Sequence, residues 1–136
     1  KIGSLKNSRI ECETFCKDFL DQLYAFELGN VLFKPTKCAL EQFRPTKEEA
    51  LSYFISGDDR KCHEDKGFAI QPWTKVRFEN SGGLILDDNR AIAMGNYFFT
   101  DTDGNEAKVE YTFGYKLIDG ELKIDLHHSS FPFPNP

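Results

Sequence analysis

The last predicted strand ends in the densest group of polar side chains in the chain, His127-His128-Ser129-Ser130. A neutral imidazole has an unperturbed pKa of about 6.5 and can accept a proton near neutral pH. A serine hydroxyl can donate a hydrogen bond to an oxygen that is gaining negative charge. Such groups need partners on the closed side of a sheet, because a buried polar group without a hydrogen bond is costly. We therefore take this polar strand end as the candidate site.

The alternation of side chains along the strand indicates which members of this group face inward. Apolar residues alternate with charged ones up to Leu126, and the same period places His128 and Ser130 on the apolar face. A β-bulge near the strand end would reverse the order and turn His127 and Ser129 inward. Both registers stay open, and the periodicity favours His128 with Ser130.

The histidines do not form a metal-binding pattern. His127 and His128 are neighbours on a strand and should point to opposite faces, so they cannot both chelate one ion without a bulge. His63 lies in a charged segment, and the sequence contains no CxxC or HExxH motif. The D-x-D-G string at 101–104 lacks the glutamate of a calcium loop, and we interpret it as a hairpin turn. The residues thus favour chemistry without a metal.

Composition is that of one globular domain, here residues 1–136, with an aromatic interior that includes 13 Phe. A net charge of -5 argues against nucleic acid as a partner, because phosphate binding needs a basic face. No apolar run is long enough for a membrane span. We expect the four cysteines to be reduced thiols in an intracellular compartment. Because the chain begins at Lys1, we expect a piece of a longer precursor that could hold several such domains.

Two helices and a set of strands must position the site. An amphipathic pattern predicts a long helix over residues 4–28. Thr46 and Glu49 form a capping-box signature that opens a short helix, which Gly57 closes. Between the helices, Pro35 limits the segment VLFKPT to an edge strand or an extended connector.

The second half of the chain is strand-like. We expect a charged surface loop over residues 58–66, strands from Gly67 onward, and turns at 81–83, at 101–105 and at Asp119-Gly120. This order of elements predicts an α+β domain, with the helices packed on one face of a curved antiparallel sheet.

Several strings in the chain resemble a known family. The order of elements and the ending DG-x-L-x-I-x-x-HHSS-x-P resemble the cone-shaped nuclear transport factor 2-like fold and, within it, the association domain of calmodulin-dependent kinase II. The iota class of carbonic anhydrases is similar over about residues 8–133, through FKPTK, FRPTKEEALSYF, GFAIQPW, MGNYFFTDTDG, VEYTFGYK and HHSSFPF.

This resemblance implies an enzyme, a carbonate dehydratase that reversibly hydrates carbon dioxide to bicarbonate. It implies no cofactor, with manganese or zinc as the less favoured alternative. The residues that it places in the pocket offer a hydroxyl or an imidazole: Thr36, Tyr53, His128 and Ser130, or His127 and Ser129 in place of the last two. For location, it suggests an intracellular compartment, with the plastid as one option.

Two other functions stay open. Ile92, Met94 and Phe98 are expected on the sheet face opposite the helices, where they would suit a homodimer or an oligomerisation module of the kinase-association type. A small-molecule isomerase or dehydratase of the same fold would be favoured by a carboxylate buried beside His128.

Overall fold

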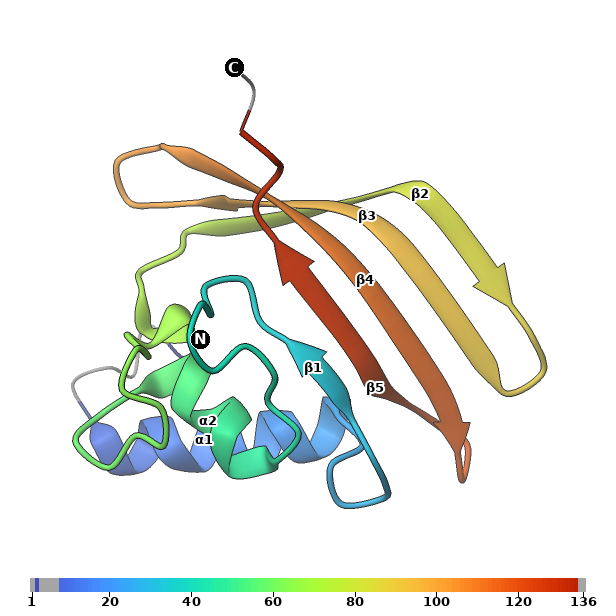
Figure 1. Ribbon diagram of the computed structural model, residues 1–136, viewed down its shortest axis with the longest axis horizontal. Helices are drawn as coiled ribbons and strands as arrows, with labels where there is room; N and C mark the ends of the chain where they lie inside the picture. Colours follow the sequence, from blue (N-terminus) through green and yellow to red (C-terminus); the bar gives the residue numbers. More distant parts are fainter. Residues whose placement is uncertain (1, 3–7, 135–136) are drawn as a thin grey trace.

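Two helices cover one face of a curved five-stranded sheet (Figure 1). The computed structural model describes residue 2 and residues 8–134. In chain order the elements are α1 (Arg9–Leu23), β1 (Leu32–Lys34), α2 (Lys47–Ile55), the 3-10 turn η2 (Phe68–Ile70), β2 (Lys75–Leu86), β3 (Arg90–Thr100), β4 (Glu106–Ile118) and β5 (Glu121–Ser130). The strands lie in the order β1-β5-β4-β3-β2. This confirms the predicted α+β class with both helices on one face of the sheet.

One strand pairing differs from the antiparallel sheet that we expected. β1 runs parallel to β5, with Phe33 beside His127, whereas the pairings among β2, β3, β4 and β5 are antiparallel. As predicted, β1 is a short edge strand, and Pro35 follows it directly. A proline cannot donate to the ladder, so the strand ends there. The parallel pairing carries the start of the FKPTK segment to the polar end of β5.

The first helix is shorter than its pattern predicts. α1 ends at Leu23 rather than at residue 28, and residues 4–7 of the prediction lie outside the described residues. Tyr24 leaves the helix to form an isolated parallel bridge with Ile124 of β5. The next amide, that of Ala25, donates a hydrogen bond to the Ile124 carbonyl at 2.9 Å. A contact with the sheet thus ends the helix at Leu23, before the chain reaches Gly29.

The local signals for caps and turns are confirmed. Thr46 Oγ1 accepts a hydrogen bond from the Glu49 amide at 3.2 Å, which caps α2 as predicted. Asp119 and Gly120 both have positive φ, 51° and 81°, and form the turn between β4 and β5. That conformation suits a two-residue hairpin turn because its twist matches that of the strands.

The middle of the chain differs from its prediction in two places. Phe68–Ile70 forms a 3-10 turn instead of a strand. Residues 81–83 lie inside β2, and the β2–β3 register shifts between Glu79 and Gly83. Gly83 has a φ of 96°, so the glycines form an irregularity within a long strand rather than its end.

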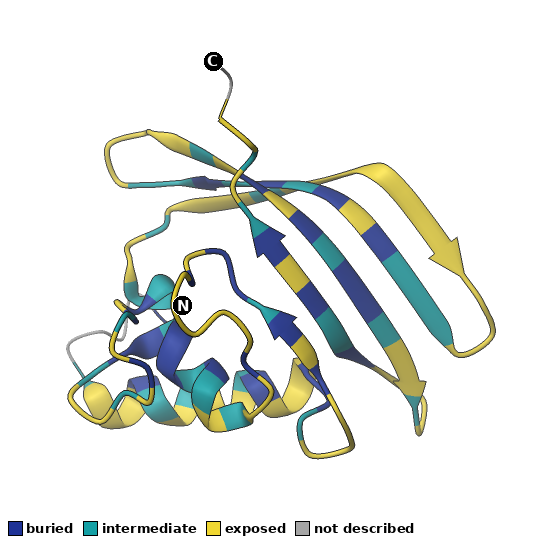
Figure 2. Cartoon of the chain, viewed as in Figure 1, coloured by how far each residue is buried: buried dark blue, intermediate teal, exposed yellow. Residues whose placement is uncertain are grey.

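The core lies between the helices and the concave face of the sheet (Figure 2), where buried residues alternate mostly with partly exposed ones along β3. Its aromatic members include Tyr24, Phe33, Tyr53, Tyr97, Phe99, Tyr111 and Phe113. All four cysteines are buried and free, as the sequence predicts. In the described part of the chain, no helix has both the length and the apolar character that a bilayer crossing requires.

Candidate functional site

A β-bulge in β5 decides which histidine enters the interior. Gly114 of β4 pairs with Leu126, but the following residue, Tyr115, pairs with Ile124, so Asp125 has no partner in β4. An extra residue of this kind reverses the side-chain alternation beyond it. The inward face of β5 therefore changes from even-numbered to odd-numbered residues at the bulge.

Beyond the bulge, His127 and Ser129 point inward. Ser129 is 1% exposed and His127 is 7% exposed, whereas His128 is exposed and Ser130 is partly buried. The favoured prediction that His128 and Ser130 face inward is therefore wrong, and the alternative register is the one that forms. The prediction that adjacent histidines point to opposite faces is confirmed.

Two contacts hold the bulge in place. Asp125 turns outward and accepts two hydrogen bonds from the Arg90 guanidinium, at 3.0 and 2.5 Å. Gly114 leaves room for Leu126, because a Cβ at position 114 would lie 2.8 Å from the Leu126 Cβ. Neither contact follows from the alternation pattern, since each joins different strands.

His127 is surrounded by neutral hydroxyl groups. Its Nδ1 lies 2.7 Å from the Tyr24 hydroxyl, and its Nε2 lies 2.8 Å from Ser129 Oγ and 3.3 Å from the Tyr97 hydroxyl. The hydroxyls of Tyr97 and Ser129 also bond to each other. The imidazole therefore joins three hydroxyls, from the residue that follows α1, from β3 and from β5, into one hydrogen-bonded cluster.

Aromatic rings cover both faces of the imidazole. The rings of Phe33 and Phe113 stack on His127 with centroid distances of 4.8 and 4.2 Å. Burial among these rings lowers the pKa of His127 to about 3, and the nearby His128 acts in the same direction. At pH 7 the imidazolium would cost roughly 5 kcal/mol, at 1.36 kcal/mol for each pKa unit. His127 is thus a neutral hydrogen-bonding group, which argues against the expected role as proton acceptor.

Thr36 and Tyr53 belong to the helical half of the chain. Both are buried, and the Tyr53 hydroxyl accepts a hydrogen bond from the Lys37 amide at 3.2 Å. Burial raises the pKa of both Tyr53 and Tyr97, and hydrogen bonds from the Lys37 amide to Tyr53 and between Ser129 and Tyr97 partly offset this rise. The structure places Thr36 and Tyr53 in the same buried core as His127 and Ser129, and the Phe33 ring contacts both Tyr53 and His127. His128 and Ser130 lie on the other face of β5.

Tyr24 and Tyr97 are the polar members of the cluster that the sequence analysis missed. Tyr97 lies on the inward, odd-numbered face of β3, so the alternation in AIAMGNYFFT could have identified it. Tyr24 had no comparable signal, because its pattern placed it inside the first helix. Only the bridge to Ile124 turns its hydroxyl toward His127.

A large cavity opens beside this cluster. Its volume is about 850 Å³, and Tyr24, Tyr97 and His127 contribute polar groups to its wall. The remaining wall is mostly aromatic and aliphatic, and includes Phe15, Phe19, Phe54, Phe68, Trp73 and Phe113. An apolar wall disfavours bound water. Because the local dielectric is then low, the hydrogen bonds at the polar end are stronger than they would be in water.

A buried ion pair fixes the segment that follows β1. The Arg44 side chain has no exposed surface and donates hydrogen bonds to both carboxylate oxygens of Asp65, at 2.8 and 2.7 Å. Arg44 also donates to the carbonyls of Glu41 and Glu49. Asp65 in turn accepts a bond from Ser52 of α2 at 2.5 Å. The ion pair therefore joins three segments behind Thr36 and Tyr53.

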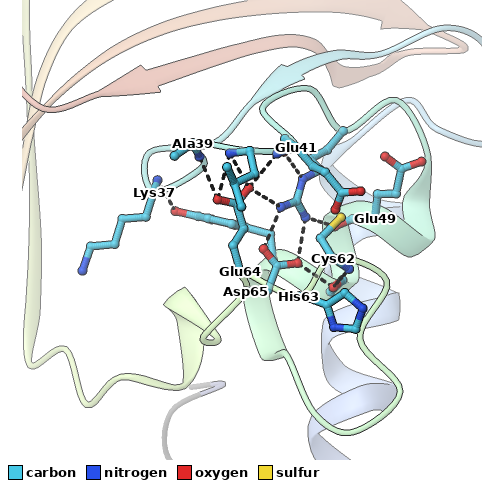
Figure 3. Close-up of polar contacts among 12 residues, drawn as sticks. Lys37, Ala39, Glu41, Glu49, Cys62, His63, Glu64 and Asp65 are labelled. Atoms are coloured by element: carbon cyan, nitrogen blue, oxygen red, sulfur yellow. Dashed lines mark hydrogen bonds and ion pairs between the residues drawn. The ribbon is translucent and has the colours of Figure 1, made fainter.

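Glu64 supports the same segment (Figure 3). Its carboxylate accepts hydrogen bonds from the backbone amides of Ala39, Leu40 and Glu41, at 2.8 to 3.1 Å. These bonds lower the pKa of Glu64. The predicted surface loop of residues 58–66 is thus wrong in part, because its end supplies a buried carboxylate and a backbone cap.

The described part of the chain offers no cluster of metal ligands. Among the residues that the structure describes, no group of three His, Cys, Asp or Glu side chains could hold a metal ion. His63 is exposed in the segment after α2, and His128 is exposed on the opposite face of β5 from His127.

The fold and the buried cluster define an α+β cone of the nuclear transport factor 2-like class. An NTF2-like protein of unknown function from Shewanella oneidensis MR-1 superimposes with a TM-score of 0.55 at 14% identity, over 95% of this chain and 89% of that chain. At this identity the likeness shows the fold alone.

Within that class, the chain belongs to the metal-independent carbonic anhydrase family, whose model matches residues 1–131. The metal-independent carbonic anhydrase of Nostoc sp. (strain PCC 7120 / SAG 25.82 / UTEX 2576) is 38% identical over 127 residues, covering 92% of this chain. The chain spans 61% of that relative's length. The crystal structure of a cyanobacterial iota-carbonic anhydrase complexed with bicarbonate superimposes with a TM-score of 0.90 at 35% identity, over 98% of this chain and 83% of that chain. The resemblance found in the sequence is confirmed.

Proposed function

We propose that this protein catalyses the reversible hydration of carbon dioxide to bicarbonate without a metal. One observation carries the proposal: in a chain of this family, a charge-free set of hydroxyls surrounds a neutral imidazole at the side of an aromatic cavity. The bicarbonate in the crystal structure of the cyanobacterial relative supports bicarbonate as the ligand here.

Carbon dioxide is apolar and favours the aromatic cavity over water. A water oxygen then forms a bond to the carbon, one C–O π electron pair moves onto the oxygen, and the attacking water loses a proton. Tyr97 lines this cavity, and its hydroxyl bonds to that of Ser129, so this pair can donate hydrogen bonds to the oxygen that gains charge. We assign the same role to the buried hydroxyls of Thr36 and Tyr53, which the family resemblance places in the pocket. Because His127 stays neutral, the released proton passes to solvent water or to a buffer base rather than to the imidazole.

The decisive experiment compares carbon dioxide hydration by stopped flow before and after metal stripping, with elemental analysis of the same samples. We expect the hydration rate to be unchanged by chelator and by added manganese or zinc. Loss of activity on stripping, with recovery on adding one of these ions, would overturn metal independence. No hydration above the buffer rate in either sample would overturn the enzymatic proposal itself.

The isomerase or dehydratase alternative has less support. It would be favoured by a carboxylate beside the buried histidine, and among the described residues only hydroxyl groups bond to the His127 ring. The buried carboxylate of Asp65 is engaged by Arg44 and Ser52.

We also propose a homodimer through the outer face of the sheet. Ile85 and Ile92 pair across β2 and β3 on this face, and Met94 beside them is 53% exposed. Phe98 contributes less, since the Arg77 guanidinium covers its ring at 4.1 Å. Sedimentation of the wild type and of Met94→Glu tests this: we expect a dimer that the charge weakens, and a wild-type monomer would refute it. Assembly of this kind is compatible with catalysis.

A further inference from the structure

We infer that Tyr24 is a positioning residue that fixes His127 as its Nε2–H tautomer, so that the hydrogen bonds of the cluster run from Tyr24 toward Ser129. The inference rests on the proposed function, since it assigns the direction in which that site can donate protons. It concerns a residue outside the segments that suggested the site.

Tyr24 is held firmly at the end of α1. It is 4% exposed, its backbone bridges to Ile124, and its ring stacks on Phe26 at 5.7 Å. Burial raises the pKa of its hydroxyl well above the ordinary value, so the group keeps its proton. Its other aromatic neighbours, Phe19 and Phe33, have no hydrogen-bond acceptor in their side chains.

The Tyr24 proton therefore has one destination. Among the described residues, the single hydrogen-bond partner of the Tyr24 hydroxyl is Nδ1 of His127, at 2.7 Å. A buried O–H without an acceptor is costly, whereas an oxygen lone pair without a donor is tolerated more easily. The Tyr24 hydroxyl thus donates to Nδ1, and Nδ1 carries no proton.

The second nitrogen then carries the proton. A neutral imidazole has one N–H, so an acceptor at Nδ1 makes Nε2 the donor. Nε2 lies 2.8 Å from Ser129 Oγ, which accepts this proton's hydrogen bond. The rings of Phe33 and Phe113, stacked on both faces, keep the imidazole in this plane.

Ser129 consequently acts as a donor and not as a nucleophile activated by His127. With its oxygen occupied by the Nε2 proton, its own O–H points onward to the Tyr97 hydroxyl or to an oxygen of the substrate. A donor directed in this way suits an oxygen that gains negative charge during hydration. The opposite tautomer would draw the serine proton away from that oxygen.

Nitrogen-15 NMR of the full chain with labelled histidine reads the tautomer directly. We expect His127 in the wild type to show a protonated Nε2 and an unprotonated Nδ1 at pH 7. In Tyr24→Phe we expect a mixture of tautomers and a fall in kcat of about tenfold, with a smaller change in KM, because donation to the substrate is impaired in part of the molecules. Tyr111→Phe is the matched control: its ring packs on Tyr97, but its hydroxyl bonds to Asn80 and to no member of the cluster, so losing the hydroxyl should change neither readout.

A protonated Nδ1 in the wild type would overturn the inference, as would an unchanged tautomer and rate in Tyr24→Phe. If Tyr24→Phe does not fold, the wild-type spectrum alone decides. The proposed function fails separately, when the wild type does not hydrate carbon dioxide whatever tautomer it holds.

Discussion

The position that a Cβ would take at residue 114 lies 2.8 Å from the Cβ of Leu126, so the bulge that places His127 inward depends on a glycine in the neighbouring strand. Asp125, the extra residue of the bulge, is held outside by Arg90. The site is thus selected by a pair of contacts between strands, one steric and one ionic.

Gly114→Ala should disturb the site more than the fold. The added methyl group overlaps Leu126, and we expect a loss of about 1–3 kcal/mol in the free energy of unfolding, because overpacking forces strands to shift. The hydration rate of the folded protein should also fall, since the strand shift moves His127. Gly29→Ala is the control: nothing lies within 4 Å of its Cβ position. Urea unfolding and stopped-flow hydration measure both effects, and equal behaviour of the two variants would contradict the role of Gly114.

Ser129 and Ser130 are adjacent serines with opposite orientations, which makes them a matched pair. We expect Ser129→Ala to lower kcat by about a hundredfold, because it removes a hydrogen-bond donor to the developing charge. Ser130→Ala should keep wild-type activity, because Ser130 lies on the outer face of β5. If the stopped-flow assay showed the loss in Ser130→Ala and not in Ser129→Ala, the active serine would be the one that the periodicity favoured.

His127 predicts an acid-sensitive stability. Its pKa is about 3 in the folded state and about 6.5 when unfolded, so the unfolded state binds more protons between these values. Stability should therefore fall as pH decreases from about 6.5, with a slope that approaches about 1.4 kcal/mol per pH unit. Urea unfolding from pH 7 to 5 measures the slope before most carboxylates titrate. In His127→Gln the slope in this range should largely disappear, and an unchanged slope would show that another group causes it.

The same low pKa predicts the pH dependence of the rate. A proton acceptor with a pKa near 6.5 would produce a step in kcat at that pH. Because His127 stays neutral down to about pH 3, we expect no such step between pH 5.5 and about 7.5. Stopped-flow hydration in a series of buffers tests this, and a clear inflection near pH 6.5 would assign proton transfer to a histidine.

Replacing Arg44 should destabilise the segment that contains Thr36, because it breaks the buried ion pair with Asp65. Arg44→Met leaves the Asp65 carboxylate buried without its cation, which costs about 3–5 kcal/mol. A second change, Asp65→Leu, in the same chain should recover part of this loss by removing the unpaired charge. Arg77→Met is the control, because Arg77 is 40% exposed and its ion pair with Glu79 contributes at most about 1 kcal/mol. Denaturant midpoints of the four proteins give the comparison, and a double variant as unstable as Arg44→Met would argue against a buried-charge penalty.

The sequence by itself determined the features that depend on neighbours a few residues away. The Thr46 cap, the Asp119-Gly120 turn and the α+β order of elements follow from local dihedral preferences, short hydrogen bonds and hydrophobic period. The motifs around Thr36 and Tyr53 also indicated the family.

Tertiary structure alone decided which pair of the HHSS run faces inward, and which partners that pair finds. Gly114 and Arg90 select the register from other strands, and Tyr24 reaches His127 across 103 positions of the chain. The lowered pKa of His127 has the same origin, because burial is a property of the assembled core and not of the strand. A period of two places a side chain on one of two faces, and a single extra residue exchanges the faces without any change in the local pattern.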